Sequence, residues 1–436
     1  MKKLNILFFS WCLIGVFNQG LAQTELTLQG AFELALQNNF SLQIASNDYV
    51  ITKKNNQIGN AGMLPTVLGT VNQDQQVVDT KQKFLSGAEN NRDGAKSSQL
   101  NGNVELSWTI FNGMKMFATR SKLQELEAMG QLKLRQQIEN TLTRVAKSYF
   151  DVVLAKEQLK SGKLFVDISQ KRLEVAQAKL QTGRSSKSEV LNAQVNLNSD
   201  IAGLKRLETQ YKNSQLSLNQ LMGMDLKFTF IPIDSLPPGS TLNFESLREN
   251  ALSNNSGVRM AKVNQTITFQ QLREIKGERY PSLQLKTGYN ASQQQSEAGF
   301  LSSAQNTGFH YGAGLSLNLF NGFDVNRRIG NAQLQYKNAE LLMKDSLLKL
   351  DIALSQAYNI YLTNLDLYQF EQSNLTVAQQ NFDIAKVQYE QGIISNNDLR
   401  LAQVNYLQNV NRLLVAAYDA RLSETELQRL SGGLIK

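Results

Sequence analysis

The stretch that decides the fold of this chain occurs twice, as LSWTIFNG at residues 106–113 and as LSLNLFNG at residues 315–322. The two copies lie 209 positions apart, and Gly183 and Gly392 are separated by the same distance. A unit of about 200 residues is far longer than the roughly 20–50 residues of solenoid repeats. The sequence therefore predicts one duplication and a chain with two-fold pseudosymmetry.

An earlier block is also repeated, with a slightly different spacing. ALQNN at residues 35–39 returns as ALSNN at 251–255, and Leu64-Pro65 corresponds to Tyr280-Pro281. Three of the five prolines lie between the two repeats, as expected for a linker. We therefore predict repeat 1 at 23–224, an inter-repeat linker at 225–241 and repeat 2 at 242–436.

Residues 1–22 have the pattern of a signal peptide. Lys2 and Lys3 precede an apolar run, and Gly20-Leu21-Ala22 supplies the small residues of a cleavage site. A transmembrane anchor is the alternative, which the shortness of the apolar run disfavours. Cys12 is the only cysteine and lies in this segment, so a disulfide framework or a thiolate metal site is not expected in the mature chain.

Apolar and polar residues alternate in three segments, which predicts strands at about 103–111, 282–292 and 309–320. A fourth strand, at about 66–73, is predicted mainly by the symmetry of the two repeats. Polar loops are expected at 74–102 and 292–308. Alternation of this kind is typical of an outer-membrane barrel and also of a soluble sheet, so the strands alone leave both readings open. For a membrane barrel, the candidate aromatic belt comprises Trp108, Tyr289, Phe309 and Tyr311.

Two very long helical hairpins are predicted at 114–222 and 323–431. The segment between Gly113 and Gly183 has no proline and only two interior glycines, and apolar residues recur three and four positions apart. Some 70 helical residues would extend roughly 100 Å, which requires packing against other long helices as in a coiled coil. The predicted junctions between helices and strands are Pro65, Pro281, Gly113 and Gly322.

Each hairpin tip has recognisable turn residues. Gly183 and Gly392 suit the left-handed residue that ends a helix. Ser186 and Ser395 follow three positions later and are expected to cap the returning helices. Glu189 completes a capping box with Ser186, and Asp398 stands at the same position in the second repeat.

Four strands per chain cannot close into a barrel, and an open edge cannot sit in lipid. The sheet is therefore expected to close by association: two chains would give a filled barrel and three an open lumen. The long helices with polar faces favour the wider tube.

In the order and spacing of these features, the chain resembles the TolC-like outer membrane efflux proteins. The resemblance extends from about Leu26 to Leu434 and rests on the duplication, the Pro and Phe-Asn-Gly junctions and the glycine-capped tips. It implies a mixed α and β membrane protein with a coiled-coil α-barrel and a trimeric twelve-stranded β-barrel. It also implies location in the outer membrane of a Gram-negative bacterium, extension into the periplasm, and partnership with a periplasmic adaptor (membrane fusion) protein and an inner-membrane transporter.

The resemblance further implies a periplasmic gate formed by Glu189, Asp398 and Tyr389. This sequence departs from the family pattern at two positions: a second family aspartate is replaced by Leu401 and a gate arginine by Ile394. Two interpretations of Glu189 and Asp398 stay open, because both carboxylates belong to capping motifs. They either cap helices alone or also form an acidic ring facing the lumen.

The sequence predicts no enzyme and no cofactor. His310 is the only histidine and falls on a polar strand face, and no acid–base or phosphate-binding constellation is recognisable. The net charge is +8, but the basic residues are scattered along the chain with acidic residues between them. No nucleic-acid partner is therefore expected. We predict a passive exit duct for efflux. The alternatives are the exit duct of a type I protein secretion system and, less favoured, a periplasmic coiled-coil scaffold.

Overall fold

The computed structural model describes residues 24–239, 242–298 and 301–434, so the predicted signal peptide lies outside the described residues. The chain forms two compact units. Unit 1 comprises the chain up to Asn39, Arg144–Gly239 and Asn364–Leu422, and unit 2 comprises the rest. Three helices contribute residues to both units: α3 (Lys115–Gln181), α7 (Asp324–Gln391) and α8 (Asn396–Leu430).

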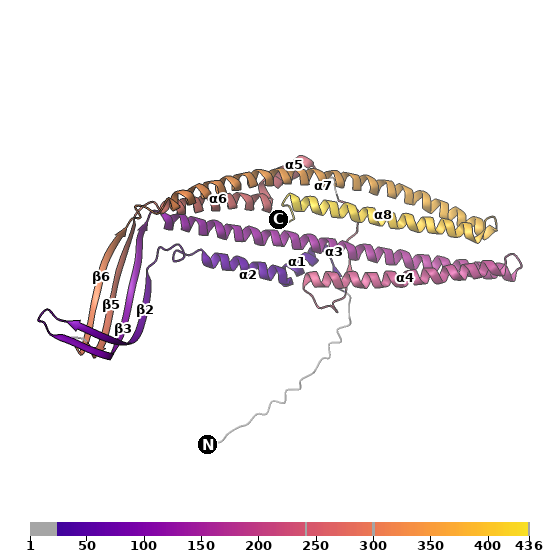
Figure 1. Ribbon diagram of the computed structural model, residues 1–436. Helices are drawn as coiled ribbons and strands as arrows, with labels where there is room; N and C mark the ends of the chain where they lie inside the picture. Colours follow the sequence, from indigo (N-terminus) through magenta and orange to yellow (C-terminus); the bar gives the residue numbers. More distant parts are fainter. Residues whose placement is uncertain (1–23, 240–241, 299–300, 435–436) are drawn as a thin grey trace, which may run out of the picture. The chain divides into compact units, whose positions relative to one another are not determined.

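Unit 1 contains the ends of both helical hairpins. The remaining elements of this unit are β1 (Thr24–Leu26), α1 (Leu28–Asn38), α4 (Lys187–Met222) and β4 (Phe230–Pro232). After each tip the chain reverses, so that α4 runs back beside α3 and α8 beside α7 (Figure 1). Short connections of this kind force successive helices to be antiparallel neighbours.

The two hairpins use the same positions for their cores. Phe382, Ala385 and Ala402 form a buried cluster in the second hairpin. In the first hairpin, the residues 209 positions earlier are likewise buried: Leu173, Ala176 and Ala193. Alanine at two of the three positions allows the helices to approach closely. The duplication in the sequence is therefore also a duplication of packing.

A short parallel pairing of β1 with β4 attaches the inter-repeat linker to unit 1. The hydroxyl group of Tyr149, which is fully buried, lies 2.8 Å from the Leu26 carbonyl oxygen and 2.7 Å from Asp234 Oδ2, and these two acceptors share its one proton. Asp234 Oδ2 also accepts from the Leu28 amide at 2.6 Å. One carboxylate thus joins α3, the linker and the start of α1.

Unit 2 contains one antiparallel sheet of four strands, in the order β2-β3-β5-β6 (Figure 1). The strands are β2 (Thr66–Lys83), β3 (Glu89–Asn112), β5 (Ser282–Ser296) and β6 (Ser303–Ser316), and the short helices are α2 (Phe40–Asn55), α5 (Phe244–Asn254) and α6 (Ser256–Gly277). Among the described residues, β2 pairs only with β3 and β6 only with β5, so both outer strands have an open edge. No helix in the described part of the chain is both long and apolar enough to cross a bilayer.

The strand limits differ from the sequence prediction. β2 and β3 extend through most of 74–102, which we expected to be a loop. The extension was not predicted because polar residues on both faces of these strands hide the alternation. β6 begins at Ser303, inside the second expected loop, and ends at Ser316 rather than near residue 320. A β-bulge between Thr109 and Phe111 also breaks the predicted alternation, so that Phe111 instead of Ile110 pairs in line with Leu283.

The register brings the four belt candidates to one face of the sheet. Tyr289 lies opposite Phe309, Tyr311 opposite Thr287, and Trp108 opposite Leu285. The four aromatic residues therefore lie at three successive levels along the strands rather than in one ring. The Trp108 indole donates to the Met63 carbonyl at 2.9 Å, which also gives this residue a role in local packing.

The repeated ALQNN and ALSNN blocks have the same role in both repeats. Asn39 Nδ2 donates to the carbonyl of Leu221 at 2.8 Å, near the end of α4. Asn255 Nδ2 donates to the carbonyl of Leu430 at 3.0 Å, at the end of α8. Each asparagine thus satisfies a carbonyl that a helix C-terminus leaves without an intrahelical partner.

The junctions between helices and strands are less symmetric than predicted. Pro281 follows the end of α6 by four residues, whereas α2 ends at Asn55, ten residues before Pro65. Both prolines directly precede a strand. The turns that return from strand to helix agree more closely, because Gly113 (φ 68°) and Gly322 (φ 63°) are both left-handed. At Gly113 a Cβ atom would lie 2.0 Å from the Gly277 carbonyl oxygen, so only glycine fits there.

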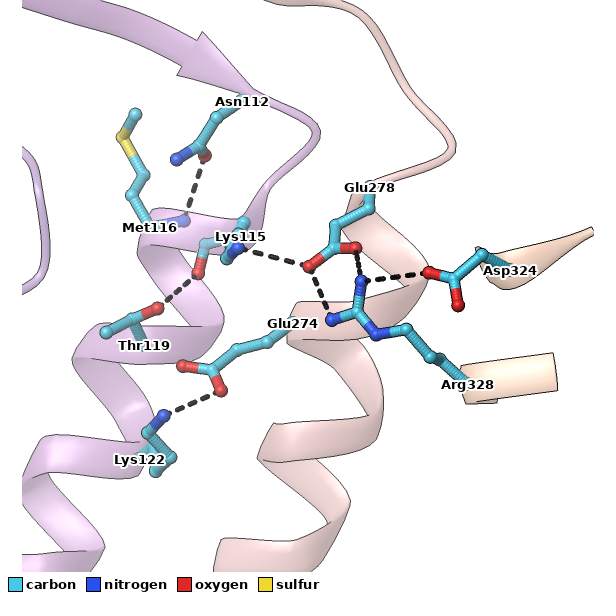
Figure 2. Close-up of polar contacts among 9 residues, drawn as sticks. All are labelled: Asn112, Lys115, Met116, Thr119, Lys122, Glu274, Glu278, Asp324 and Arg328. Carbon is cyan, nitrogen blue, oxygen red and sulfur yellow. Dashed lines mark hydrogen bonds and ion pairs between the residues drawn. The ribbon is translucent and has the colours of Figure 1, made fainter. Parts of the chain in front are cut away.

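A carboxylate joins three helices at this junction in unit 2. Glu278, just after α6, accepts from Lys115 of α3 at 3.2 Å and from Arg328 of α7 through both of its oxygens (Figure 2). One turn away, Lys122 donates to Glu274 at 2.7 Å. These ion pairs connect the helices that lead into and out of the sheet.

Candidate functional site at the hairpin tips

Both tips turn with the same backbone geometry. Gly183 has φ 70° and Gly392 has φ 82°, both in the left-handed region that glycine tolerates. The next amide in each turn, that of Arg184 or Ile393, donates 2.8 Å to a carbonyl five residues earlier. This is the Schellman pattern of helix termination, and it leaves only a few residues for the reversal.

The two returning helices are capped differently. At the second tip, Asp398 Oδ2 accepts from both the amide and the hydroxyl of Ser395, and the Asp398 amide donates back to that hydroxyl. This is a complete reciprocal capping box. The hydrogen bonds from Ser395 lower the pKa of Asp398.

At the first tip, only half of the expected box forms. Ser186 accepts from the Glu189 amide at 3.2 Å. The Glu189 carboxylate turns away from the Ser186 backbone: it accepts from the Ser185 hydroxyl at 2.7 Å and from Tyr389 at 3.2 Å. The longer glutamate side chain reaches the neighbouring hairpin, which the expectation of a simple capping box did not include.

Tyr389 links the two hairpins at their tips. Its side chain is 2% exposed, and its hydroxyl donates to Glu189 Oε1. The Lys179 ammonium lies 3.7 Å from the centre of the Tyr389 ring and donates to its carbonyl. Burial and the nearby Glu189 charge raise the pKa of Tyr389 to about 12. The phenol therefore stays protonated, and able to donate, at physiological pH.

A second polar cluster joins the hairpins further from the tips. Arg400 of α8 forms a bidentate ion pair with Asp200 of α4, at 2.7 and 2.8 Å. Asp200 also accepts from Ser169 at 2.5 Å. Gln403, which is fully buried, donates to Ser169 and accepts from Arg172 at 3.2 Å. One connected network therefore spans α3, α4 and α8.

The second cluster was not predicted from the sequence, although the repeat contained a signal for it. At the corresponding positions of the other repeat, Arg172 is matched by Asn381, Asp200 by Asn409 and Arg400 by Leu191. A charge in one copy where the other copy is neutral marks a place where the hairpins are used differently. The two departures from the family pattern make no such link: Leu401 is 63% exposed, and Ile394 packs against the apolar core of the second hairpin.

This constellation is suited to holding and releasing hairpins rather than to bond chemistry. Its contacts are hydrogen bonds and ion pairs between helices. No group of residues that could hold a metal ion occurs in the part of the chain that the structure describes. Because phenol–carboxylate and ion-pair contacts can break without rearrangement of the helices that carry them, the two clusters are candidates for reversible ties.

Comparison with known proteins places this geometry in a family. The profile of the family described as outer membrane efflux protein matches residues 31–224 and 247–433, one match to each repeat. The outer membrane efflux protein BepC of Brucella suis is 22% identical over 430 residues, which cover 93% of this chain and 87% of BepC. The pyoverdine export outer membrane protein OpmQ of Pseudomonas putida is 29% identical over 229 residues, covering 51% of this chain and 45% of OpmQ.

Solved structures show the same fold. The CmeC outer membrane channel of Campylobacter jejuni superposes with a TM-score of 0.76 at 16% identity, covering 94% of this chain and 86% of CmeC. The outer membrane protein VceC of Vibrio cholerae gives a TM-score of 0.74 at 15% identity, covering 93% of this chain and 96% of VceC.

These matches define a class of protein, an outer membrane channel with the TolC-like fold of long helical hairpins and four strands per chain. The chain belongs to the outer membrane efflux protein family. The expectations of an efflux function, location in the outer membrane and mixed α and β architecture are thereby confirmed.

Proposed function

We propose that three copies of this chain assemble into a passive export conduit, closed in the outer membrane by a twelve-stranded barrel. In this proposal, a periplasmic adaptor and an inner-membrane transporter deliver the substrate to the helical end. The chain itself supplies the passage and performs no catalysis. Relatives such as BepC and OpmQ are named for efflux and export, which supports this role.

The observation that carries the proposal is the state of the sheet in a single chain. Both edge strands have open backbone groups, and one face carries exposed apolar side chains. Val71 is 76% exposed, Phe309 67% and Leu315 71%. Apolar side chains this exposed favour a lipid environment, and open edges in lipid require pairing with another strand. Association of identical sheets satisfies both needs.

The opposite face of the sheet suits an aqueous lumen. Glu105 and His310 lie on this face, and their side chains approach to 3.8 Å across Gly288. A Cβ atom on Gly288 would lie 2.8 Å from the imidazole ring, so the glycine makes room for this approach. Lys286 and Asn290, the alternate neighbours along β5, share this polar face.

The tip clusters would form the periplasmic gate of the conduit. Tyr389–Glu189 and Arg400–Asp200 each join the second hairpin to the first. We infer that these ties hold the closed arrangement, and that opening separates the hairpins within each copy. Glu189 and Asp398 would then contribute carboxylates to an acidic ring at the mouth.

Native mass spectrometry of the protein in detergent tests the assembly directly. The expected result is a trimer, with monomer appearing only under conditions that also unfold the sheet. A stable folded monomer, or a closed dimer, would overturn the proposal. Planar-bilayer recordings provide the second measurement, because a conduit of this kind should give cation-preferring conductance without an added energy source.

A further inference from the structure

A cavity of about 320 Å³ lies in the helical wall of unit 1, beside the tip contacts. Its walls come from both hairpins, with Leu164, Ile168 and Val175 on α3 and Phe382, Leu399 and Tyr406 on α7 and α8. Phe382 and Tyr406 stack nearly parallel, with an interplanar angle of 5° and ring centres 5.6 Å apart. The volume is at the lower end of the range for small-molecule sites, and the lining is mainly apolar, as such sites require.

One buried charge lies in this wall. Arg172 is only 3% exposed, yet no carboxylate within the described residues forms an ion pair with it. Its Nη1 donates to Gln403, while Nε and Nη2 are buried and make no hydrogen bond in the described chain. Nε and Nη2 form one side of the guanidinium fork, which matches two oxygens of an oxyanion. An orphaned fork of this kind is costly in a protein interior.

The remaining charges around the cavity balance one another. Lys171 and Lys386 are exposed at its rim, and so are Asp383 and Glu390. The charge without a neutralising partner at the cavity is therefore the positive charge of the buried Arg172. Burial, with the neighbouring charge of Arg400, lowers the pKa of Arg172 to about 10, although the charge of Asp200, which is itself paired with Arg400, opposes this shift. The guanidinium therefore remains a cation near neutral pH.

We propose that this cavity is a binding site for a small anionic amphiphile, whose carboxylate or sulfonate occupies the free fork of Arg172 and whose flat apolar body lies along Phe382 and Tyr406. The Gln403 contact fixes the orientation of the guanidinium. Because Nε and Nη2 are closed to solvent in this structure, the lining side chains must move aside to admit the oxyanion. The ligand contacts both hairpins and Tyr389, which also lines the cavity. Occupancy therefore stabilises the arrangement in which Tyr389 reaches Glu189.

Naphthalene-2-sulfonate is a suitable probe, and the uncharged naphthalene-2-sulfonamide is its matched control. Binding is measured by isothermal titration calorimetry on the full protein in lipid nanodiscs, with empty nanodiscs as the blank. The sulfonate is expected to bind about ten- to a hundredfold more tightly than the sulfonamide, as two hydrogen bonds to a charged group imply. Hydrogen–deuterium exchange should slow in residues 164–175 and 379–390 on binding.

Two variants locate the site. Arg172→Gln retains a donor for Gln403 but removes the fork, so the two probes should bind equally. Ile168→Phe keeps the arginine and fills the cavity, so neither probe should bind. Arg184→Gln, at an exposed arginine outside the cavity, is the matched control and should leave both affinities unchanged.

The proposal is overturned if sulfonate and sulfonamide bind the unchanged protein equally, which would indicate partition into an apolar groove. It is also overturned if the preference for sulfonate survives in Arg172→Gln, or if Ile168→Phe binds as the unchanged protein does. Should Arg172→Gln fail to fold, Ile168→Phe and the exchange pattern decide the outcome.

Discussion

The two hairpin tips have the same turn, the same cap position and the same core positions, yet they use their carboxylates differently. Asp398 closes its box onto Ser395 and belongs wholly to its own helix. Glu189 reaches Tyr389 of the other hairpin. One additional methylene separates a carboxylate that caps from one that also links. The two tips are equivalent in the repeat, but a few substitutions let the first tip accept a hydrogen bond from the second.

The same asymmetry explains the second tie. Asp200 and Arg400 pair between hairpins, while their repeat equivalents Asn409 and Leu191 carry no charge. Each tie therefore takes a carboxylate from the first hairpin and a donor from the second. If the arrangement is one-sided in this way, loss of the Asp200–Arg400 contact should have the largest effect on stability.

Asp200→Asn should give the largest loss of stability. The ion pair is mostly buried, with side-chain exposures of 22% for Arg400 and 15% for Asp200. Removing one partner should leave Arg400 unpaired near Arg172 and cost about 2–4 kcal/mol, somewhat less than a fully buried pair. Unfolding followed by far-ultraviolet circular dichroism measures the loss.

Two companion variants sharpen this result by making the repeats more alike. Asp200→Asn with Arg400→Leu installs the neutral pair of the other repeat and should recover part of the loss, because no unpaired cation remains. Asn409→Asp places the carboxylate in the second hairpin beside Arg412, but Asn409 is only 9% exposed and its Nδ2 donates to the Asn405 carbonyl at 2.8 Å. The substitution loses that donor and should therefore give no net gain in stability. A double variant less stable than Asp200→Asn alone would contradict this account.

Tyr389→Phe should have an intermediate effect. It removes one hydroxyl from a buried ring and leaves the cation–π contact with Lys179 intact. Loss of a hydrogen bond to a carboxylate should cost about 1–2 kcal/mol. If the contact holds the gate closed, single-channel recordings should show longer open times. A double-mutant cycle with Glu189→Gln should then give a clear coupling energy, and purely additive effects would show that the two residues act independently.

How far the sequence could predict this molecule depended on whether a feature was repeated. The long hairpins, the tip glycines and the caps appear in both copies, so each copy checked the other. The β2–β3 extension escaped prediction because residues 74–102 are mainly polar on both faces. The bulge before Phe111 was equally hidden, because one extra residue does not change composition.

Within the candidate site, sequence reasoning found Glu189, Tyr389 and Asp398 but not how they are connected. Spacing along one helix predicts a cap, whereas the Glu189–Tyr389 contact joins residues 200 positions apart. Arg172 was missed for a related reason: a single arginine in a helix is usually solvated, and only packing shows that this one is buried. Departures from the repeat pattern were the signal that the sequence offered.

The tie at Tyr389 should weaken at high pH. Its pKa is raised to about 12 in the folded protein against an ordinary value of 10.0. A group whose folded pKa is raised contributes stability that is complete below the unfolded pKa and is lost as pH rises through the folded value. The contribution of Tyr389 should therefore fall between about pH 10 and 12. Ultraviolet difference titration of the protein against Tyr389→Phe should show one tyrosine ionising in this range, and ionisation near pH 10 would mean that the ring is not buried.

The smallest effect separates capping from gating at the two carboxylates. Glu189→Gln retains an oxygen that can accept from Tyr389, and glutamine serves in a capping box, so the variant should lose no more than about 1 kcal/mol. Asp398→Asn should differ in its pH dependence. Because Ser395 lowers the folded pKa of Asp398, its contribution is present above the unfolded pKa and lost as pH falls through the lowered value. This acid-dependent loss should disappear in Asp398→Asn and persist in Glu189→Gln.

If both carboxylates also face the mouth, the double variant should reduce cation selectivity and block by multivalent ions, because a narrow ring of one charge sign concentrates counter-ions. Unchanged selectivity together with the predicted acid behaviour would show that Asp398 only caps its helix and that Glu189 acts only through Tyr389.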